Sequence, residues 1–275
     1  MLKLLIDRLS YKPKPLRLYS AGTSDAGLVR KRNEDNIFID EKLRLFMVAD
    51  GMGGHEDGDV ASSLAIEIIS SEIQQLNLAK GEHTHRRNAA AIPPLIQHVI
   101  EEANTLIHGD NLSRGLNEGR GMGTTVSGLW IGPAANDYQS RLYTFNVGDS
   151  RIYSYTDGIL KQLSTDHSHY QLWLDRGQEG PEPRHNSIYK AIGPWQRVIA
   201  EQKSYPITDK TLYLLCSDGL SNMLDDMSIR SILHKHLHED HSSLSIVAEK
   251  LVDAANLAGG KDNISVVLIR PDFFL

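Results

Sequence analysis

The chain has 275 residues, of which 40% are hydrophobic and 23% are charged, and it contains no long tract rich in Ser, Pro or Gly. These values predict a folded protein with a substantial core and exclude a disordered polymer. Acidic residues outnumber basic ones by 35 to 29, and the resulting formal net charge of -6 argues against a general affinity for nucleic acids.

The first half of the chain predicts a leader, three strands and two helices. Residues 1–16 are expected to be a loosely attached leader because Pro13 and Pro15 interrupt regular structure, and residues 17–275 are expected to form one domain. Alternating and buried apolar patterns predict strands, and apolar positions at helical spacing predict helices joined by an exposed connection over residues 77–92. The predicted strands are 17–21, 36–40 and 44–49, and the predicted helices are 59–76 and 94–108.

The second half predicts more strands and a second pair of helices. Asp157-Gly158 predicts a tight hairpin turn, and residues 165–186, rich in His, Gly, Pro and charge, predict a short helix within a mobile surface flap. Strands are predicted at 124–131, 141–147, 151–155, 159–163, 198–204, 212–216 and 264–269, and helices at 226–237 and 243–257. Because strands and helices come in consecutive groups, we predict an α+β fold: a central antiparallel β-sandwich flanked by helices on both outer faces, in α-β-β-α layers.

The sequence indicates a compartment as well as a fold. Cys216 is the only cysteine, so no internal disulfide can form, and a reducing cytoplasm is favoured. The apolar run near Met1 is too short for a secretory signal, and no apolar stretch approaches the length that spans a membrane. We therefore expect a cytoplasmic monomer without a membrane or nucleic acid partner.

Four short acidic clusters suggest metal-ion chemistry. They lie at residues 33–36, 50–54, 217–219 and 261–263, and at least three of them stand where an apolar strand meets a turn. A folded sheet can bring such distant carboxylates to one point, where they need cations, and Mg²⁺ or Mn²⁺ suits a site made of oxygen ligands. Arg30, upstream of these clusters, suggests that a phosphate is bound there.

Together with further motifs, these clusters resemble the ordered motif set of the bacterial metal-dependent serine/threonine protein phosphatases of type 2C, the PPM family. The resemblance runs from about Leu18 to the C-terminus. Each motif alone is a weak signal, but seven in the family's order and rough spacing are a strong one. The motifs are Thr23 to Arg30, Asn33-Glu34-Asp35-Asn36, Val48 to His55, Gly121-Met122-Gly123-Thr124-Thr125, Val147-Gly148-Asp149-Ser150-Arg151, Cys216 to Leu220 and Lys261-Asp262-Asn263.

The resemblance implies two Mn²⁺ or Mg²⁺ ions and assigns their ligands. Asp50 would bridge both ions, Asp218 and Asp262 would complete one coordination sphere, and the carbonyl group of Gly51 would serve the other. Glu34 would act largely through metal-bound water. A third ion, held by Asp218 and an acid before the Met-Gly-Thr-Thr motif, is left open: Glu118 is the nearest candidate, but Arg120 lies close enough to compete with a cation.

The other site residues also take their roles from the resemblance. Arg30 would clamp the phosphoryl oxygens, and Asp35 and Asn263 would orient the metal ligands. Asp149 ends a strand as the metal ligands do, but the resemblance gives it a structural hydrogen-bonding role. Met52 stands where many eukaryotic relatives have a histidine that is proposed to protonate the leaving group, so this proton must come from elsewhere.

The function implied by the resemblance is hydrolysis of phosphoserine and phosphothreonine in proteins by a hydroxide that bridges two divalent ions. Its partners would be phosphorylated proteins, including serine/threonine kinases and the substrates of those kinases. The alternative is a catalytically silent type 2C-like binding or signalling module. Because every expected metal ligand is present in the sequence, the active enzyme is preferred.

Overall fold

The protein is a sandwich of two antiparallel sheets, seen in a computed structural model that describes residues 16–53, 57–78, 89–133, 140–237 and 243–273. The five-stranded sheet has the order β1-β11-β10-β7-β8, and the other has the order β2-β3-β5-β6-β9, with β4 paired to β3. The first sheet consists of β1 (Leu16–Asp25), β7 (Arg151–Thr156), β8 (Ile159–Gln162), β10 (Leu212–Cys216) and β11 (Ile264–Phe273). The second consists of β2 (Asp35–Asp40), β3 (Leu45–Met52), β4 (Gly123–Thr124), β5 (Val126–Pro133), β6 (Ser140–Val147) and β9 (Glu201–Pro206).

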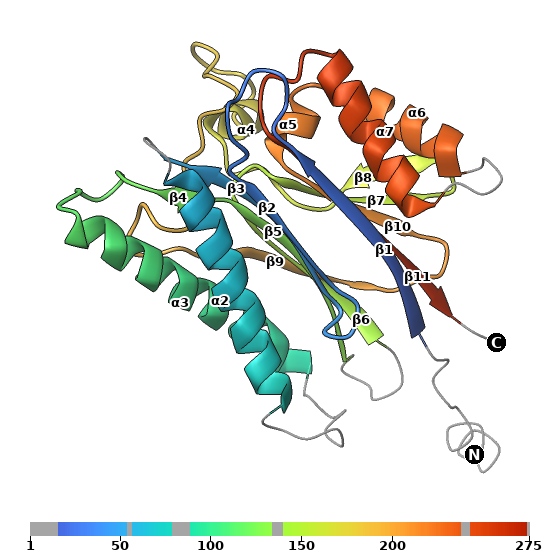
Figure 1. The fold of residues 1–275 in the computed structure, drawn as a ribbon, viewed down its shortest axis with the longest axis horizontal. Coiled ribbons are helices and arrows are strands. Elements are labelled where there is room, and N and C mark those ends of the chain that lie inside the picture. The colour runs from blue at the N-terminus through green and yellow to red at the C-terminus, as the bar shows by residue number, and fades with distance from the viewer. Residues whose placement is uncertain (1–15, 54–56, 79–88, 134–139, 238–242, 274–275) are drawn as a thin grey trace.

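Helices cover both outer faces of the sandwich (Figure 1). α2 (Gly58–Leu78) and α3 (Ile92–Ser113) pack on the six-stranded sheet, and α6 (Asp226–Leu237) and α7 (Leu244–Leu257) pack on the five-stranded sheet. This arrangement confirms the predicted α-β-β-α layers. The remaining helices are short: η1 (Ala89–Ala91), α4 (His169–Asp175) and α5 (Asp218–Ser221). Within the described ranges, no helix combines the length and the apolar character needed to cross a bilayer.

The central strands are apolar on both faces because each face meets a different layer. In β3, Leu45 and Met47 pack against α2 and α3, whereas Phe46 and Val48 pack against the other sheet. Successive side chains of a strand point to opposite faces, so burial on both faces requires an uninterrupted apolar run. The same rule explains the apolar run of β10.

Three predicted boundaries are corrected by the structure. The strand predicted at 124–131 is broken, because the backbone N–H of Thr125 donates to the carbonyl oxygen of Asp50 at 2.9 Å and β5 starts only at Val126. Ile92 is not part of an exposed connection: it begins α3 and is fully buried, whereas residues 79–88 of that connection lie outside the described residues. β9 begins at Glu201 rather than at residue 198.

The hairpin predicted at Asp157-Gly158 is confirmed. Both residues have positive φ angles, 49° and 79°, as a primed two-residue turn requires. β1 begins at Leu16, the last residue of the predicted leader, and residues 1–15 lie outside the described residues.

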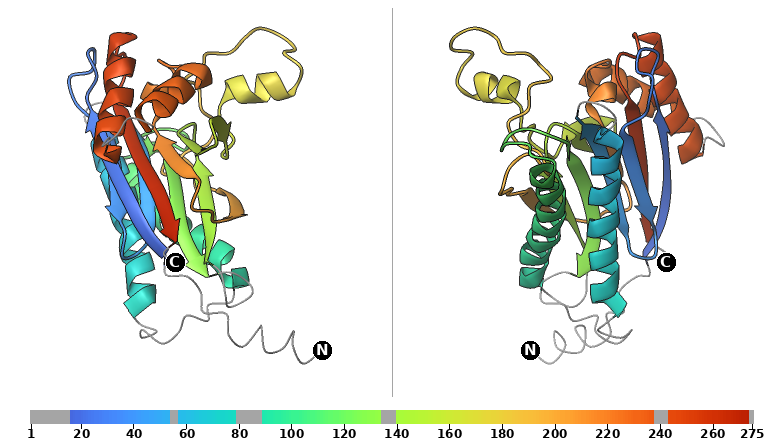
Figure 2. Two further views of the ribbon diagram at one scale, coloured as in Figure 1. Left: turned by 90° about the vertical axis from the view of Figure 1, so that its right-hand side faces the viewer. Right: turned by 60° about the vertical axis from the view of Figure 1, so that its left-hand side comes forward.

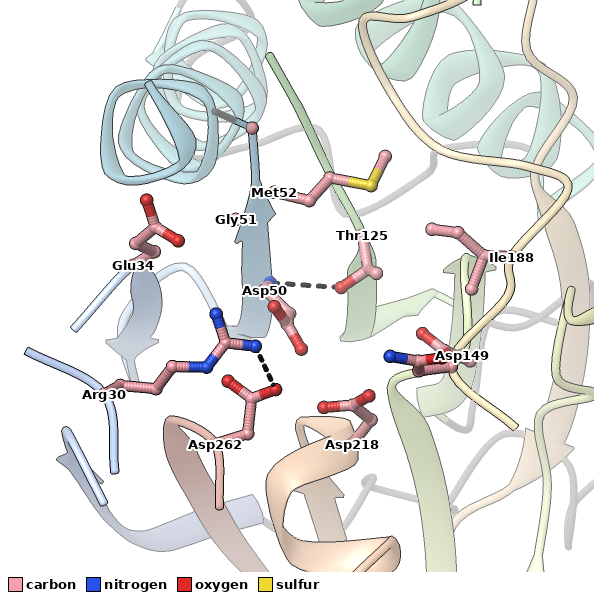
Figure 3. A pocket seen from close by; sticks show the side chains of 12 residues that line it. Arg30, Glu34, Asp50, Gly51, Met52, Thr125, Asp149, Ile188, Asp218 and Asp262 are labelled. Atoms are coloured by element: carbon pink, nitrogen blue, oxygen red, sulfur yellow. Dashed lines mark hydrogen bonds and ion pairs between the residues drawn. The ribbon is translucent and has the colours of Figure 1, made fainter. Parts of the chain in front are cut away.

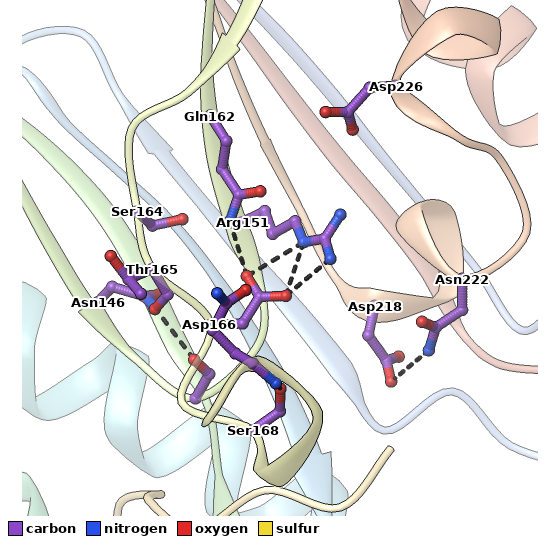
Figure 4. A network of polar contacts seen from close by, with 12 residues as sticks. Asn146, Arg151, Gln162, Ser164, Thr165, Asp166, Ser168, Asp218, Asn222 and Asp226 are labelled. Atoms are coloured by element: carbon purple, nitrogen blue, oxygen red, sulfur yellow. Dashed lines mark hydrogen bonds and ion pairs between the residues drawn. The ribbon is translucent and has the colours of Figure 1, made fainter. Parts of the chain in front are cut away.

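The segment from Thr165 to Asn186 is anchored at its start and stands away from the sandwich further on. α4 has no buried residue and lies apart from both sheets (Figure 2). Asp166, by contrast, is buried and accepts hydrogen bonds from Arg151 Nη2 and Gln162 Nε2, both at 2.7 Å (Figure 4). Further along the segment, Ser168 and Ile188 form an isolated antiparallel bridge, which carries the returning chain back to the body of the protein.

A cross-strand contact between Gly128 and Phe145 predicts a stability effect. The two residues are partners on β5 and β6, and a Cβ at position 128 would overlap the Phe145 ring. We expect Gly128→Val to lower the free energy of unfolding by about 2 kcal/mol, because the buried ring must shift. Urea denaturation measures this change.

The matched control is Gly109→Ala in α3, where a Cβ meets nothing within 4 Å. This substitution should raise the free energy of unfolding by about 0.5–1 kcal/mol because it removes helix-interior glycine. An unchanged urea midpoint for Gly128→Val would show that the core absorbs the added side chain.

Candidate active site

A polar pocket of about 190 Å³ lies at one end of the sandwich and is drawn in Figure 3. It brings together six of the predicted site residues from four separate parts of the chain: the β1–β2 connection, the end of β3, the start of α5 and the turn before β11. The predicted residues are Arg30, Glu34, Asp50, Gly51, Asp218 and Asp262, and the pocket is completed by Met52, Gly53, Thr125, Asp149, Asn186 and Ile188.

Asp50 and Gly51 reach the pocket because β3 continues past its apolar core. The backbone N–H of Asp50 donates to Thr125 Oγ1 at 3.0 Å, and the backbone N–H of Gly51 donates to the Glu34 carbonyl oxygen at 3.2 Å. A Cβ at position 51 would overlap the carbonyl oxygens of Gly58 and Glu34. Glycine is therefore required for this close approach, which also holds Glu34 beside the end of β3.

Asp218 and Asp262 enter from the other sheet. Asp218 is the first residue of α5 and is separated from β10 by Ser217 alone; Asn222 Nδ2 donates to its Oδ2 at 3.0 Å (Figure 4). The Oδ1 atom of Asp218 is buried without a hydrogen-bond partner. Asp262 precedes β11 and accepts a hydrogen bond from Arg30 Nη2 at 2.7 Å, with side chains 34% and 50% exposed, respectively.

Asp35 and Asn263 lie behind the pocket and connect its parts. The buried Asp35 carboxylate accepts a hydrogen bond from Ser217 Oγ at 2.7 Å. Asn263 Oδ1 accepts from the Glu34 backbone N–H at 2.9 Å, while its Nδ2 donates to the carbonyl oxygens of Ala26 and Arg32 at 3.0 and 2.8 Å. Asn263 therefore fixes both ends of the loop that carries Arg30.

The pocket concentrates negative charge that is poorly solvated. Burial, followed by the nearby carboxylates Asp35 and Asp218, raises the pKa of Asp50 well above its ordinary value. Burial and then the charge of Asp262 raise the pKa of Asp218 to about 6. Burial also raises the pKa of Glu34. These shifts have the sign expected for carboxylates that are buried close to one another.

Asp149 is a pocket residue that the sequence prediction excluded from the metal ligands. It follows β6, and its pKa is raised to about 8, by burial first and then by the charge of Asp218. The signal that could have placed it there is the one that found Asp50 and Asp218, an acid at the end of a buried apolar run. Asn186 and Ile188 had no such signal because they come from the irregular chain after α4.

Glu118 is not among the described residues that line the pocket. Its Oε1 instead accepts a hydrogen bond from the backbone N–H of Gln196 at 3.3 Å. Met52 does line the pocket, whereas His55 lies outside the described residues. Among the described residues, no three Asp, Glu, His or Cys side chains converge on one ion position by themselves.

Comparison with known proteins identifies the class of this site. The sequence profile described as protein phosphatase 2C matches residues 29–254. A serine/threonine phosphatase stp of Listeria monocytogenes (serotype 4b, strain F2365) is 35% identical over 258 residues, which cover 90% of this chain and 94% of that protein. The serine/threonine protein phosphatase PstP of Mycobacterium tuberculosis (strain ATCC 25618 / H37Rv) is 33% identical over 263 residues, covering 92% of this chain and 45% of that longer protein.

Solved structures show the same similarity in three dimensions. The catalytic domain of serine/threonine protein phosphatase PstP in complex with two manganese ions has a TM-score of 0.76 at 30% identity, covering 94% of this chain and 99% of that one. PppA, a regulatory component of the type VI secretion system in Pseudomonas aeruginosa, also has a TM-score of 0.76, at 27% identity, covering 94% and 100% of the two chains. With its motifs, its pocket and its fold in agreement, the chain belongs to the protein phosphatase 2C family.

Proposed function

We propose that this protein hydrolyses phosphoserine and phosphothreonine in other proteins at the pocket around Asp50, with Mn²⁺ or Mg²⁺ as cofactor. The observation that carries the proposal is the meeting of Asp50, Asp218 and Asp262, from three distant positions, beside the guanidinium group of Arg30. Family membership and the phosphatase relatives support the same reaction. No observation favours a catalytically silent module.

The chemistry of the pocket fits divalent ions with oxygen ligands. Its donors are carboxylates and a backbone carbonyl, it holds no thiol or imidazole among the described lining residues, and it contains an unpartnered buried oxygen on Asp218. Positive charge would relieve the repulsion that raises the pKa values of Asp50 and Asp218. In the proposed assignment, the carboxylates of Asp50, Asp218 and Asp262 would hold the ions, and the carbonyl group of Gly51 and the side chain of Glu34 would complete the ligand set.

Bound ions would supply two things to the reaction: an activated water as nucleophile and positive charge for the phosphoryl oxygens. Arg30 binds the phosphoryl group through its forked N–H donors, and its hydrogen bond to Asp262 orients the guanidinium toward the pocket. Asp35 and Asn263 keep the ligand-bearing segments in place. Met52 has no proton to donate to the leaving group, so we assign that proton to water.

The substrates in this proposal are phosphorylated proteins, among them serine/threonine kinases and the proteins that these kinases modify, in the cytoplasm. The pocket, at about 190 Å³, has room for a phosphorylated side chain but does not enclose a whole peptide. We do not include Glu118 in the proposed site, and a third ion stays a prediction from the resemblance.

Removing metal or Asp50 should abolish turnover. We expect Mn²⁺-dependent release of phosphate from a phosphothreonine peptide, loss of release in excess chelator, and a decrease of about 10²–10³-fold for Asp50→Asn, which removes a group that organises transition-state charge. Steady-state kinetics measures the decrease, and circular dichroism verifies that the variant is folded. Full activity of Asp50→Asn would refute the assigned centre.

Replacing Arg30 should weaken substrate binding. Arg30→Ala removes a charge-assisted hydrogen-bond clamp, so the KM for the phosphopeptide should rise about ten-fold or more, with a smaller effect on kcat. Arg30→Lys is the matched control: it keeps the charge but loses the fork, and it should recover only part of the affinity. A KM equal to that of the wild type for Arg30→Ala would exclude phosphate binding by this residue.

Removing one carboxylate should stabilise the metal-free protein. Since the folded state raises the pKa of Asp218 from 3.8 to about 6, ionisation of this group lowers stability as pH rises from about 4 to about 6, and the loss is complete above that range. In chelator at pH 7.5, Asp218→Asn should raise the free energy of unfolding by roughly 1–2 kcal/mol, and the gain should shrink as pH falls toward 4.5. Urea melts at several pH values measure it, and a pH-independent gain would point to a cause other than charge.

A further inference from the structure

The loop between β1 and β2 exposes two large aliphatic side chains directly before the pocket residue Arg30 in the chain. Leu28 and Val29 are 69% and 65% exposed, and the next residue, Arg30, lines the pocket. The loop lies at the same end of the molecule as α5 and the end of α7 (Figure 1). Two exposed aliphatic residues therefore stand immediately before the residue that is proposed to bind the phosphoryl group.

These side chains are exposed on a backbone that is held in place. The backbone N–H groups of Leu28 and Val29 both donate to the carbonyl oxygen of Gly260, at 2.7 and 3.2 Å. Gly27 has a φ of 74°, and a Cβ there would overlap the carbonyl oxygen of Asp262. With Asn263 bonded to both ends of the loop, the backbone of Leu28 and Val29 is held in place, so a partner that contacts this loop need not order its backbone.

A positive charge adjoins the aliphatic pair. Lys31 is exposed and makes no ion pair with another described residue, on a protein whose formal net charge is -6. Leu28, Val29 and Lys31, here called the rim, flank Arg30 in the chain and thus combine two aliphatic side chains with a cation that no described residue neutralises. Such a surface complements a chain segment that carries an aliphatic and an acidic residue.

We propose that the rim docks the segment of a phosphoprotein substrate next to its phosphorylated residue, and that it favours an aliphatic and an acidic residue there. The proposal rests on the proposed function. Leu28, Val29 and Lys31 are the chain neighbours of Arg30, which lines the pocket. A substrate whose phosphoryl group reaches Arg30 therefore brings the residues that flank its phosphorylated residue close to the rim. The pocket itself contacts only the phosphorylated side chain. In this proposal, the preference for particular neighbouring residues therefore arises at the rim.

Isolated exposed aliphatic residues are common on protein surfaces, so the test needs a matched control. Ile159 supplies it: it is 67% exposed on the β7–β8 hairpin and does not line the pocket. The variants are the double substitution Leu28→Ser with Val29→Ser, the single substitution Lys31→Gln, and Ile159→Ser.

The experiment compares kcat/KM with Mn²⁺ for phosphothreonine peptides that differ only beside the phosphorylated residue. One carries Leu and Glu, one Ser and Glu, and one Leu and Gln, with each pair placed in turn before and after phosphothreonine. Rates on p-nitrophenyl phosphate, which has no flanking chain, normalise each variant. The wild type should prefer the Leu-Glu peptide on one of the two sides.

The double variant should lower the preference for Leu over Ser about four- to five-fold, the effect expected for one aliphatic contact, mainly through KM. Lys31→Gln should lower the preference for Glu over Gln and remove its dependence on salt. Ile159→Ser should leave both preferences as in the wild type. Thermal melts of all variants confirm that they are folded.

Two negative results are distinguishable. If the wild type has no flanking preference, or if the double variant keeps it, while p-nitrophenyl phosphate is hydrolysed in the presence of Mn²⁺, the rim is not a docking surface and the proposed function stands. If the wild type hydrolyses no phosphorylated substrate with Mn²⁺, the proposed function and the rim are both wrong.

Discussion

The hydrogen bond between Ser217 and Asp35 joins the two sheets at the end where the pocket lies. Ser217 follows β10 of one sheet and Asp35 begins β2 of the other, and the Ser217 hydroxyl also accepts from the backbone N–H of Ser265 at 2.9 Å. Each residue adjoins a proposed ligand, since Asp218 follows Ser217 and Glu34 precedes Asp35. This buried hydrogen bond thus sets the separation between proposed ligands that belong to different sheets. Because it is buried, it is costly to break.

The apolar layers and the polar end of the sandwich place opposite demands on the fold. Between the sheets, residues such as Phe46 and Leu215 are fully buried and stabilise the sandwich over most of its length. At the pocket end, the same strands deliver carboxylates whose pKa values are raised by burial and by one another. The core therefore stabilises a charge arrangement that the pocket alone could not sustain, as is common where function conflicts with local stability.

The sequence predicted the parts of the site that follow local rules. Asp50 and Asp218 end buried apolar runs, and Asp262 precedes one, so both the strands and the acids were recognisable. Asp149 carried the same signal but was given a different role. Ile188 was beyond prediction, because its place in the pocket depends on a bridge to Ser168 across an irregular segment that has no periodic pattern. The break between β4 and β5 was missed because it follows from a long-range bond between Thr125 and Asp50.

The ion pair between Arg30 and Asp262 is suited to exchange. Both side chains are about one third to one half exposed, and ion pairs of this kind contribute only about 0–1 kcal/mol to stability. Arg30 can therefore turn from Asp262 to a phosphoryl group, and Asp262 toward a cation, at little cost. The loop backbone that carries Arg30 is meanwhile fixed by Asn263 and Gly260, so only side chains need to move. A site that repeatedly binds and releases a charged group requires a firmly positioned backbone and weakly paired side chains.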